Sequence, residues 1–99
     1  MERAPKAAPT VTVHLPASFA KAASSRRRLS VAGNTVGEAL SALTARHPGL
    51  RPRLRTEAGQ LRPFVLVFLN SEDIRSKEGE QTPVCDGDKL DIVSAAEGG

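Results

Sequence analysis

The sequence has few of the residue types that most often carry chemistry. It contains no tryptophan, no tyrosine, two histidines and one cysteine. The single cysteine, Cys85, cannot close an internal disulfide, and His14 and His47 alone do not form a cluster with the spacing of a zinc site. We therefore expect no disulfide framework, no metal site and no bound cofactor.

Long apolar runs are missing as well. The longest is FVLVFL at residues 64–69, which is far shorter than the roughly 20 residues of a membrane-spanning helix. The first residues, MERAPKAAP, lack the apolar centre of a signal peptide. We expect no membrane partner and a cytoplasmic location.

The positive charge is modest and unevenly distributed. There are 14 Lys and Arg against 11 Asp and Glu, for a formal net charge of +3, and the arginines concentrate in SRRRL (25–29) and RHPGLRPRLR (46–55). Stacking aromatics and groove-reading motifs are lacking, so we expect no nucleic-acid partner. A positive surface that docks an acidic partner, or one that is simply solvated, fits equally well.

Apolar periodicity predicts the first three elements. TVTVHLP (10–16) and RLSVAG (28–33) alternate like half-buried strands that pair as a hairpin, with His14 facing outward. NTVGEALSALTARHPG (34–49) then changes to the spacing of a helix. Thr35 and Glu38, in that segment, have the spacing of a capping box, in which each side chain satisfies the other's free backbone amide.

The second half of the chain is predicted to return to strands. FVLVFL (64–69) is continuously apolar, which favours a central strand buried on both faces, and NSED turns it into a short return strand at DIR (73–75). The turn Asp86-Gly87-Asp88 precedes the last strand, KLDIV (89–93).

The order of these elements predicts an α+β fold for a single domain at residues 10–95. We expect a mixed four- to five-stranded sheet, in which the first and last strands are parallel neighbours and one main helix packs across one face. Residues 1–9 are expected to form a mobile extension and residues 96–99 a flexible tail. The predicted core consists of Val11, Val13, Leu15, Leu29, Val31, Leu40, Leu43, Val65, Val67, Leu90 and Ile92.

Catalytic groups are scarce. A nucleophile needs a base within hydrogen-bond reach and usually an orienting group. Cys85 adjoins the negative charges of Asp86 and Asp88, which weaken a thiol as a nucleophile, so we interpret it as a small half-buried apolar residue. We predict that the protein is not an enzyme in its own right.

The last two residues, Gly98 and Gly99, suggest a different chemistry. A tail without side chains can extend through a narrow channel and place its carboxylate in a partner's active site. Transfer of AMP from ATP would make that carboxylate a mixed anhydride, open to attack by sulfide, a persulfide, a thiol or an amine. The partner would supply ATP, magnesium and electrostatic stabilisation.

The whole pattern resembles the ThiS/MoaD sulfur-carrier family, which has the ubiquitin-like β-grasp fold. The similar segments are NTVGEALSALTARHP, FVLVFLNSEDIR and DGDKLDIVSAAEGG, and the resemblance extends over residues 10–99. RPFVLVFLNSEDIR and the long first loop are most similar to the actinobacterial carriers of the CysO type, which deliver sulfur to a cysteine-synthase-like enzyme.

The resemblance implies that Gly99 is adenylated by an E1-like enzyme of the ThiF/MoeB type and then converted to a thiocarboxylate. Gly98, Glu97 and Ala96 would thread into the partner, where the charged Glu97 must find a cation or stay solvated. A synthase would accept the sulfur, whether cysteine-synthase-like, thiazole-synthase-like or of another kind, and a sulfurtransferase is a further candidate partner.

Several alternatives stay open at this point. Family resemblance suggests a hydrophobic docking face with Phe68 and Leu69 as candidates, although a strand this apolar also fits the core. A ubiquitin-like modifier would join Gly99 to lysines through isopeptide bonds, and in a plain binding module the glycines would be incidental. The sulfur could end in cysteine, a thiazole, a molybdopterin dithiolene or a sulfur-containing natural product. Gly99 is either encoded as the last residue or exposed by proteolysis.

Overall fold

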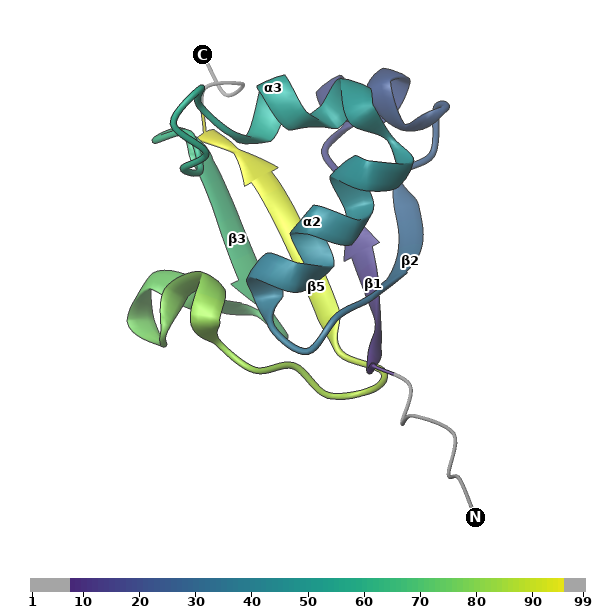
Figure 1. Cartoon of the computed structure of the whole chain (residues 1–99). Coiled ribbons are helices and arrows are strands. Elements are labelled where there is room, and N and C mark those ends of the chain that lie inside the picture. Colours follow the sequence, from purple (N-terminus) through teal and green to yellow (C-terminus); the bar gives the residue numbers. More distant parts are fainter. Residues whose placement is uncertain (1–7, 96–99) are drawn as a thin grey trace.

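The computed structural model describes residues 8–95 as a sheet with one long helix across one face and several short helices along its ends (Figure 1). Residues 1–7 and the predicted tail, 96–99, lie outside the described part. The elements in chain order are β1 (Thr10–His14), α1 (Ala17–Ala20), η1 (Lys21–Ala23), β2 (Arg28–Ala32), α2 (Val36–Arg46), η2 (Pro48–Leu50), α3 (Arg51–Leu54), β3 (Val65–Leu69), β4 (Glu72–Asp73), η3 (Ile74–Ser76), η4 (Gly79–Gln81) and β5 (Lys89–Ser94).

The sheet is mixed and five-stranded, with the order β2-β1-β5-β3-β4. β1 and β5 are parallel neighbours in the middle, with Val13 opposite Leu90, and β1 pairs with β2 antiparallel. β3 pairs antiparallel with β5 and with β4, which is only two residues long. The predicted β-grasp topology is confirmed, including the parallel pairing of the first and last strands.

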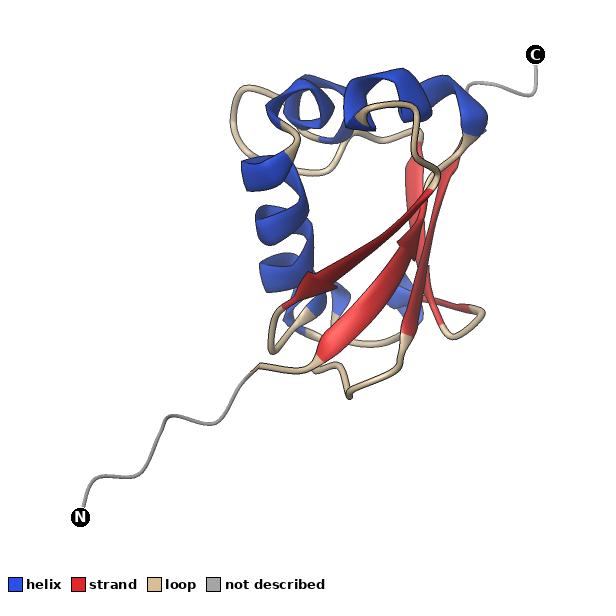
Figure 2. Cartoon of the chain, turned by 90° about the vertical axis from the view of Figure 1, so that its right-hand side faces the viewer, coloured by secondary structure: helices blue, strands red, loops and turns tan. Residues whose placement is uncertain are grey.

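Helix α2 covers one face of the sheet and leaves the other face open (Figure 2). It begins with the predicted cap, because the Glu38 N–H donates to Thr35 Oγ1 at 3.2 Å. The reciprocal half of the capping box differs from the prediction: Glu38 Oε1 accepts from the N–H of Asn34 at 2.8 Å rather than from Thr35. The Val36 N–H donates to the Thr82 carbonyl at 3.0 Å, which fastens the start of the helix to the segment before β5.

Every residue of the predicted core is buried between α2 and the sheet. The structure adds a second group that sequence periodicity did not identify, contributed by short helices and connecting segments: Phe19, Ala23, Leu50, Ile74 and Val84. Two members of this group, Phe19 and Ala23, come from α1 and η1, so the first loop is a compact helical segment rather than an open loop.

β3 differs from the prediction of a strand buried on both faces. Val65, Val67 and Leu69 point into the core, whereas Leu66 and Phe68 are only half-buried. No helix of the described residues covers the opposite face of the sheet (Figure 2). A continuous apolar run therefore conceals an ordinary alternation, in which one side of the strand is open.

The turn before β5 is held by side chains. Asp88 Oδ2 accepts from the Cys85 N–H at 2.8 Å, and its other oxygen accepts from Asn70 Nδ2 at 3.0 Å. Asn70 belongs to the β3–β4 turn, where it has a positive φ of 48°. Cys85 itself is exposed, so the interpretation as a half-buried apolar residue is wrong; the turn directs its side chain outward.

Gly33 directly follows β2 and lies against the backbone of α2. A Cβ at this position would lie 2.6 Å from the Ala39 nitrogen and 2.9 Å from the Glu38 carbonyl carbon. Both are backbone atoms, so relief of the clash requires a shift of the helix. We expect Gly33→Ala to lower the free energy of unfolding by about 2–3 kcal/mol, measured by urea denaturation.

Gly49→Ala is the matched control for this prediction. Its Cβ would make an ordinary 3.4 Å contact with the Cβ of Ala22, and the free energy of unfolding should change by less than about 1 kcal/mol. Equal stability of the two variants would contradict the steric explanation for Gly33.

Candidate functional site

The point where the tail begins is fixed at the end of β5. Ser94 is buried and lies opposite Val65, and the Ala95 N–H donates to the Phe64 carbonyl at 2.7 Å. β3 therefore holds the last described residue in a defined position. The predicted site residues that follow it lie outside the described part: Ala96, Glu97, Gly98 and Gly99.

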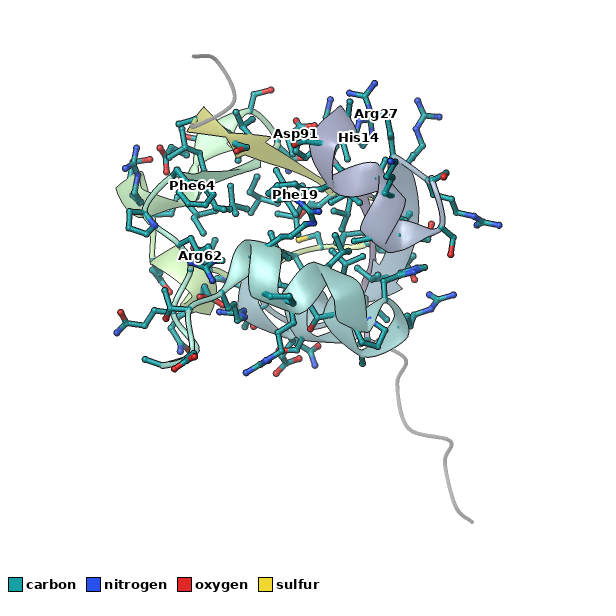
Figure 3. The ribbon with its side chains drawn as sticks, turned by 90° about the horizontal axis from the view of Figure 1, so that it is seen from above. His14, Phe19, Arg27, Arg62, Phe64 and Asp91 are labelled. Atoms are coloured by element: carbon teal, nitrogen blue, oxygen red, sulfur yellow. The ribbon has the colours of Figure 1, made fainter. Side chains whose placement is uncertain are left out.

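A network of hydrogen bonds supports this position from the α3 side. The Arg62 N–H donates to the Leu54 carbonyl at 2.8 Å, and Arg62 Nε donates to the Pro52 carbonyl at 2.7 Å. The Val65 N–H then donates to the Arg62 carbonyl at 2.9 Å. These bonds fix the approach to Phe64, which is 37% exposed and lies near Arg62 (Figure 3).

Arg55 and Glu80 form a bidentate ion pair beneath this segment. Arg55 Nη1 donates to Glu80 Oε2 at 2.9 Å and Nη2 donates to Glu80 Oε1 at 2.7 Å, while Nη1 also donates to the Gly59 carbonyl at 2.9 Å. The side chain of Arg55 is only 9% exposed. Its hydrogen bonds with Glu80 raise the pKa of Arg55 above its ordinary value. Sequence reasoning did not identify this pair, because its members are distant along the chain and follow no local pattern.

The open sheet face carries a small apolar surface, which we call the apolar patch: Leu66, Phe68 and Val93. Leu66 lies directly opposite Val93 in the β3–β5 ladder, and Val93 is 41% exposed. Phe68 was predicted both as core and as a partner-facing residue, and it is half-buried on this face. Leu69, proposed beside it for the same surface, points into the core and is 5% exposed, because adjacent strand residues face opposite sides.

A groove crosses the open face from the apolar patch to the edge at β2. It is lined by Phe68, Val93, His14, Asp91, Arg27 and Arg28, and it reaches Ser94 at the end of β5. His14, Asp91 and Arg27 lie on the same side of the molecule (Figure 3). His14 Nδ1 lies 3.7 Å from Asp91 Oδ1, so the predicted outward position of His14 is confirmed.

The groove offers an open contact surface on the sheet. Among residues 8–95, no three His, Cys, Asp or Glu side chains gather in a way that could hold a metal ion. No helix of the described residues is long and apolar enough to cross a membrane. The arrangement can dock a partner beside the start of the tail.

Comparison with known proteins identifies the family. The ThiS family model matches residues 13–99. The chain belongs to the ThiS family. The sulfur carrier protein CysO of Mycobacterium tuberculosis is 34% identical over 90% of this chain and 98% of its own length. The small archaeal modifier protein 3 of Haloferax volcanii is 35% identical over 66% of this chain and 70% of its own length.

Solved structures agree with this assignment. The crystal structure of Mycobacterium tuberculosis CysO matches with a TM-score of 0.80 at 33% identity, over 86% of this chain and 98% of that one. A chain of the Amycolatopsis orientalis BexX/CysO complex matches with a TM-score of 0.82 at 35% identity, over 90% of this chain and 99% of that one. This member of the ThiS family is thus CysO-like and has the ubiquitin-like β-grasp fold.

The Arg55–Glu80 pair should contribute substantially to stability. Glu80→Ala leaves a largely buried guanidinium without its carboxylate, so we expect the free energy of unfolding to fall by about 2–3 kcal/mol. Hydrogen exchange should also become faster at the Gly59 and Arg62 amides.

Glu78→Ala is the control, because Glu78 is exposed and makes no ion pair within residues 8–95. It should change the free energy of unfolding by less than about 0.5 kcal/mol. If Glu80→Ala were as stable as this control, the ion pair would have no role in stabilising the segment that leads to Phe64.

Proposed function

We propose that this protein is a sulfur carrier whose Gly99 carboxylate is adenylated by an E1-like enzyme of the ThiF/MoeB type and then converted to a thiocarboxylate. The observation that carries the proposal is the similarity to CysO over 98% of that protein's length, together with a family match that extends to Gly99. The protein would act as a co-substrate of its partners, not as an enzyme.

Two substitutions account for the chemistry, the first at the α-phosphorus of ATP and the second at the carbonyl carbon of Gly99. The Gly99 carboxylate attacks the α-phosphorus of ATP and pyrophosphate leaves, which forms an acyl adenylate. Sulfide or a persulfide sulfur then attacks the carbonyl carbon and AMP leaves; a persulfide also requires reductive cleavage of its S–S bond by a thiol. ATP and magnesium belong to the activating enzyme, which would stabilise the developing charge.

Two features of the described residues support this role. β3 holds the start of the tail at Ala95 through the bond from the Ala95 N–H to the Phe64 carbonyl, so a domain docked by its open face presents the tail in a defined direction. The apolar patch on that face offers Phe68 and Val93 as contact residues, in line with the hydrophobic docking face that the family resemblance implies.

The acceptor of the sulfur is proposed to be a biosynthetic synthase. CysO of Amycolatopsis orientalis forms a complex with BexX, which is a precedent for a partner that binds the carrier directly. The acceptor would be a cysteine-synthase-like or a thiazole-synthase-like enzyme, and a sulfurtransferase would be a further partner. These reactions would take place in the cytoplasm.

A ubiquitin-like modifier is the alternative, favoured by the similarity to the small archaeal modifier protein 3. Both functions begin with the same adenylate. They differ in the nucleophile that follows, which is a sulfur compound for a carrier and a lysine amine for a modifier.

Removal of the last two residues tests the proposal. We expect the wild type, incubated with ATP, sulfide and a ThiF/MoeB-type enzyme, to exchange one oxygen for sulfur at Gly99, as located by intact mass and fragmentation. The variant that lacks Gly98 and Gly99 should show no exchange and an unchanged melting temperature, because the tail follows the last strand.

Cys85→Ser controls for the exposed thiol, since oxidation of a cysteine adds nearly the same mass as an oxygen-to-sulfur exchange. It should gain sulfur as the wild type does. If no sulfur reaches Gly99 with any of several activating enzymes, and lysine conjugates form instead, the modifier function replaces the carrier function.

The apolar patch gives a second test. Val93→Glu places a carboxylate on the docking face, and we expect kcat/KM for AMP transfer to fall at least about tenfold. Ala58→Glu introduces the same charge at an exposed position outside the groove and should have little effect. Equal rates for the two variants would show that the enzyme does not use this face.

A further inference from the structure

Four arginines gather at the β2 edge of the open sheet face, and we call them the basic rim: Arg26, Arg27, Arg28 and Arg46. Arg27 and Arg28 line the groove that reaches Ser94. Arg26, Arg28 and Arg46 line a neighbouring hollow on the outer side of β2. Arg28 belongs to both, so the groove and the hollow form one continuous positive surface.

The charge of the basic rim is not compensated within residues 8–95. The ion pairs of this part involve other cations, namely His14, Arg55, Arg75, Lys77 and Lys89. The carboxylate nearest to the rim along the groove is Asp91, which already lies close to His14 and Lys89. A cluster of like charges without a counterion raises the local potential and attracts an acidic surface.

Two of the guanidinium groups are held in place by neutral acceptors. Arg27 Nε donates to the Leu15 carbonyl at 3.2 Å, and Arg46 Nη1 donates to the Ser30 carbonyl at 3.0 Å. Each group keeps further N–H donors and its full charge. Such groups suit bidentate bonds to carboxylates.

The backbone that carries the rim is also fixed. The Ser25 N–H donates to the Ala20 carbonyl at 2.7 Å and the Arg26 N–H donates to the Ala23 carbonyl at 3.0 Å. Ser24 and Ser25 have positive φ angles of 58° and 64°, which turn the chain sharply from η1 toward β2. A positioned rim loses less conformational entropy on binding than a loose loop would.

We propose that the basic rim receives acidic side chains of the adenylating enzyme, while the apolar patch receives its hydrophobic contacts. This inference rests on the proposed function and adds the chemistry of the partner's surface. One groove is lined by the patch at one end and by the rim at the other, and it reaches the start of the tail at Ser94. A protein that covers the groove and takes the tail must therefore meet both.

A protein surface fits the rim better than a nucleic acid does. Single-stranded nucleic acids are held by aromatic stacking platforms beside the positive charge. Phe68 is the only Phe, Tyr or Trp that lines the groove or the hollow, and it lies at the end of the groove away from the rim. An acidic protein surface needs only the arginines.

Charge reversal at Arg28 tests the proposal. Its side chain makes no hydrogen bond within residues 8–95, so Arg28→Glu should leave the melting temperature nearly unchanged. We expect kcat/KM for AMP transfer to fall about tenfold at 50 mM salt, mainly through KM, and the difference from the wild type to shrink at 500 mM salt. Arg28→Lys keeps the positive charge and should therefore stay within about threefold of the wild type at both salt concentrations.

Arg51→Glu is the matched control, since Arg51 is exposed on α3, on the helical side of the molecule. It changes the net charge equally and should alter kcat/KM by less than about twofold. Docking is measured separately by titrating isotope-labelled carrier with the enzyme without ATP. Amide signals of Arg26 and Arg28 should broaden in the wild type together with that of Val93.

The outcomes separate the two proposals. Wild-type adenylation with equal rates for Arg28→Glu and Arg51→Glu would overturn the role of the basic rim and leave the carrier function standing. A wild type that neither docks nor is adenylated would overturn both. Binding of a labelled 20-nucleotide RNA at 150 mM salt that is lost in Arg28→Glu, while AMP transfer is unaffected, would assign the rim to nucleic acid instead.

Discussion

The parallel pairing of β1 with β5 is the constraint on which the rest of the structure depends. Parallel neighbours cannot be joined by a tight turn, so all residues between them form one long crossover that contains α2 and the remaining strands. The pairing also makes the two strands end at the same side of the sheet. For this reason the chain that leaves β1 toward the basic rim and the chain that leaves β5 toward Gly99 begin close together.

The end of β5 is held in place by hydrogen bonds, whereas one face of the sheet is open. Hydrogen bonds from Ala95 to Phe64 and from Arg62 to Leu54 and Pro52 anchor the end of β5 on the helical side. The other side of the sheet has no helix over it within residues 8–95 (Figure 2). A partner can thus approach the sheet broadly while the exit point of the tail stays constant, as the proposed transfer of sulfur from Gly99 would require.

Much of this architecture was predictable from periodicity, and the exceptions have identifiable causes. Alternation in TVTVHLP placed His14 outside, and the Thr35 cap set the start of α2 correctly. The run FVLVFL was misread because uninterrupted apolar residues do not reveal which face is covered, and for the same reason Phe68 and Leu69 stayed open between a docking face and the core. The Arg55–Glu80 pair depends on tertiary proximity alone, so neither secondary-structure propensity nor the spacing of the two residues in the sequence predicts it.

The hydrogen bond from Arg46 to the Ser30 carbonyl also covers part of the free edge of the sheet at β2. In the β1–β2 ladder that carbonyl points away from β1, toward the free edge of the sheet. Exposed strand edges recruit further strands and lead to aggregation. An arginine that occupies the edge on one side, with a two-residue strand on the other, discourages the sheet from growing by strand addition. Both edges of the sheet are thereby protected against strand addition, while the open face stays accessible for the proposed docking.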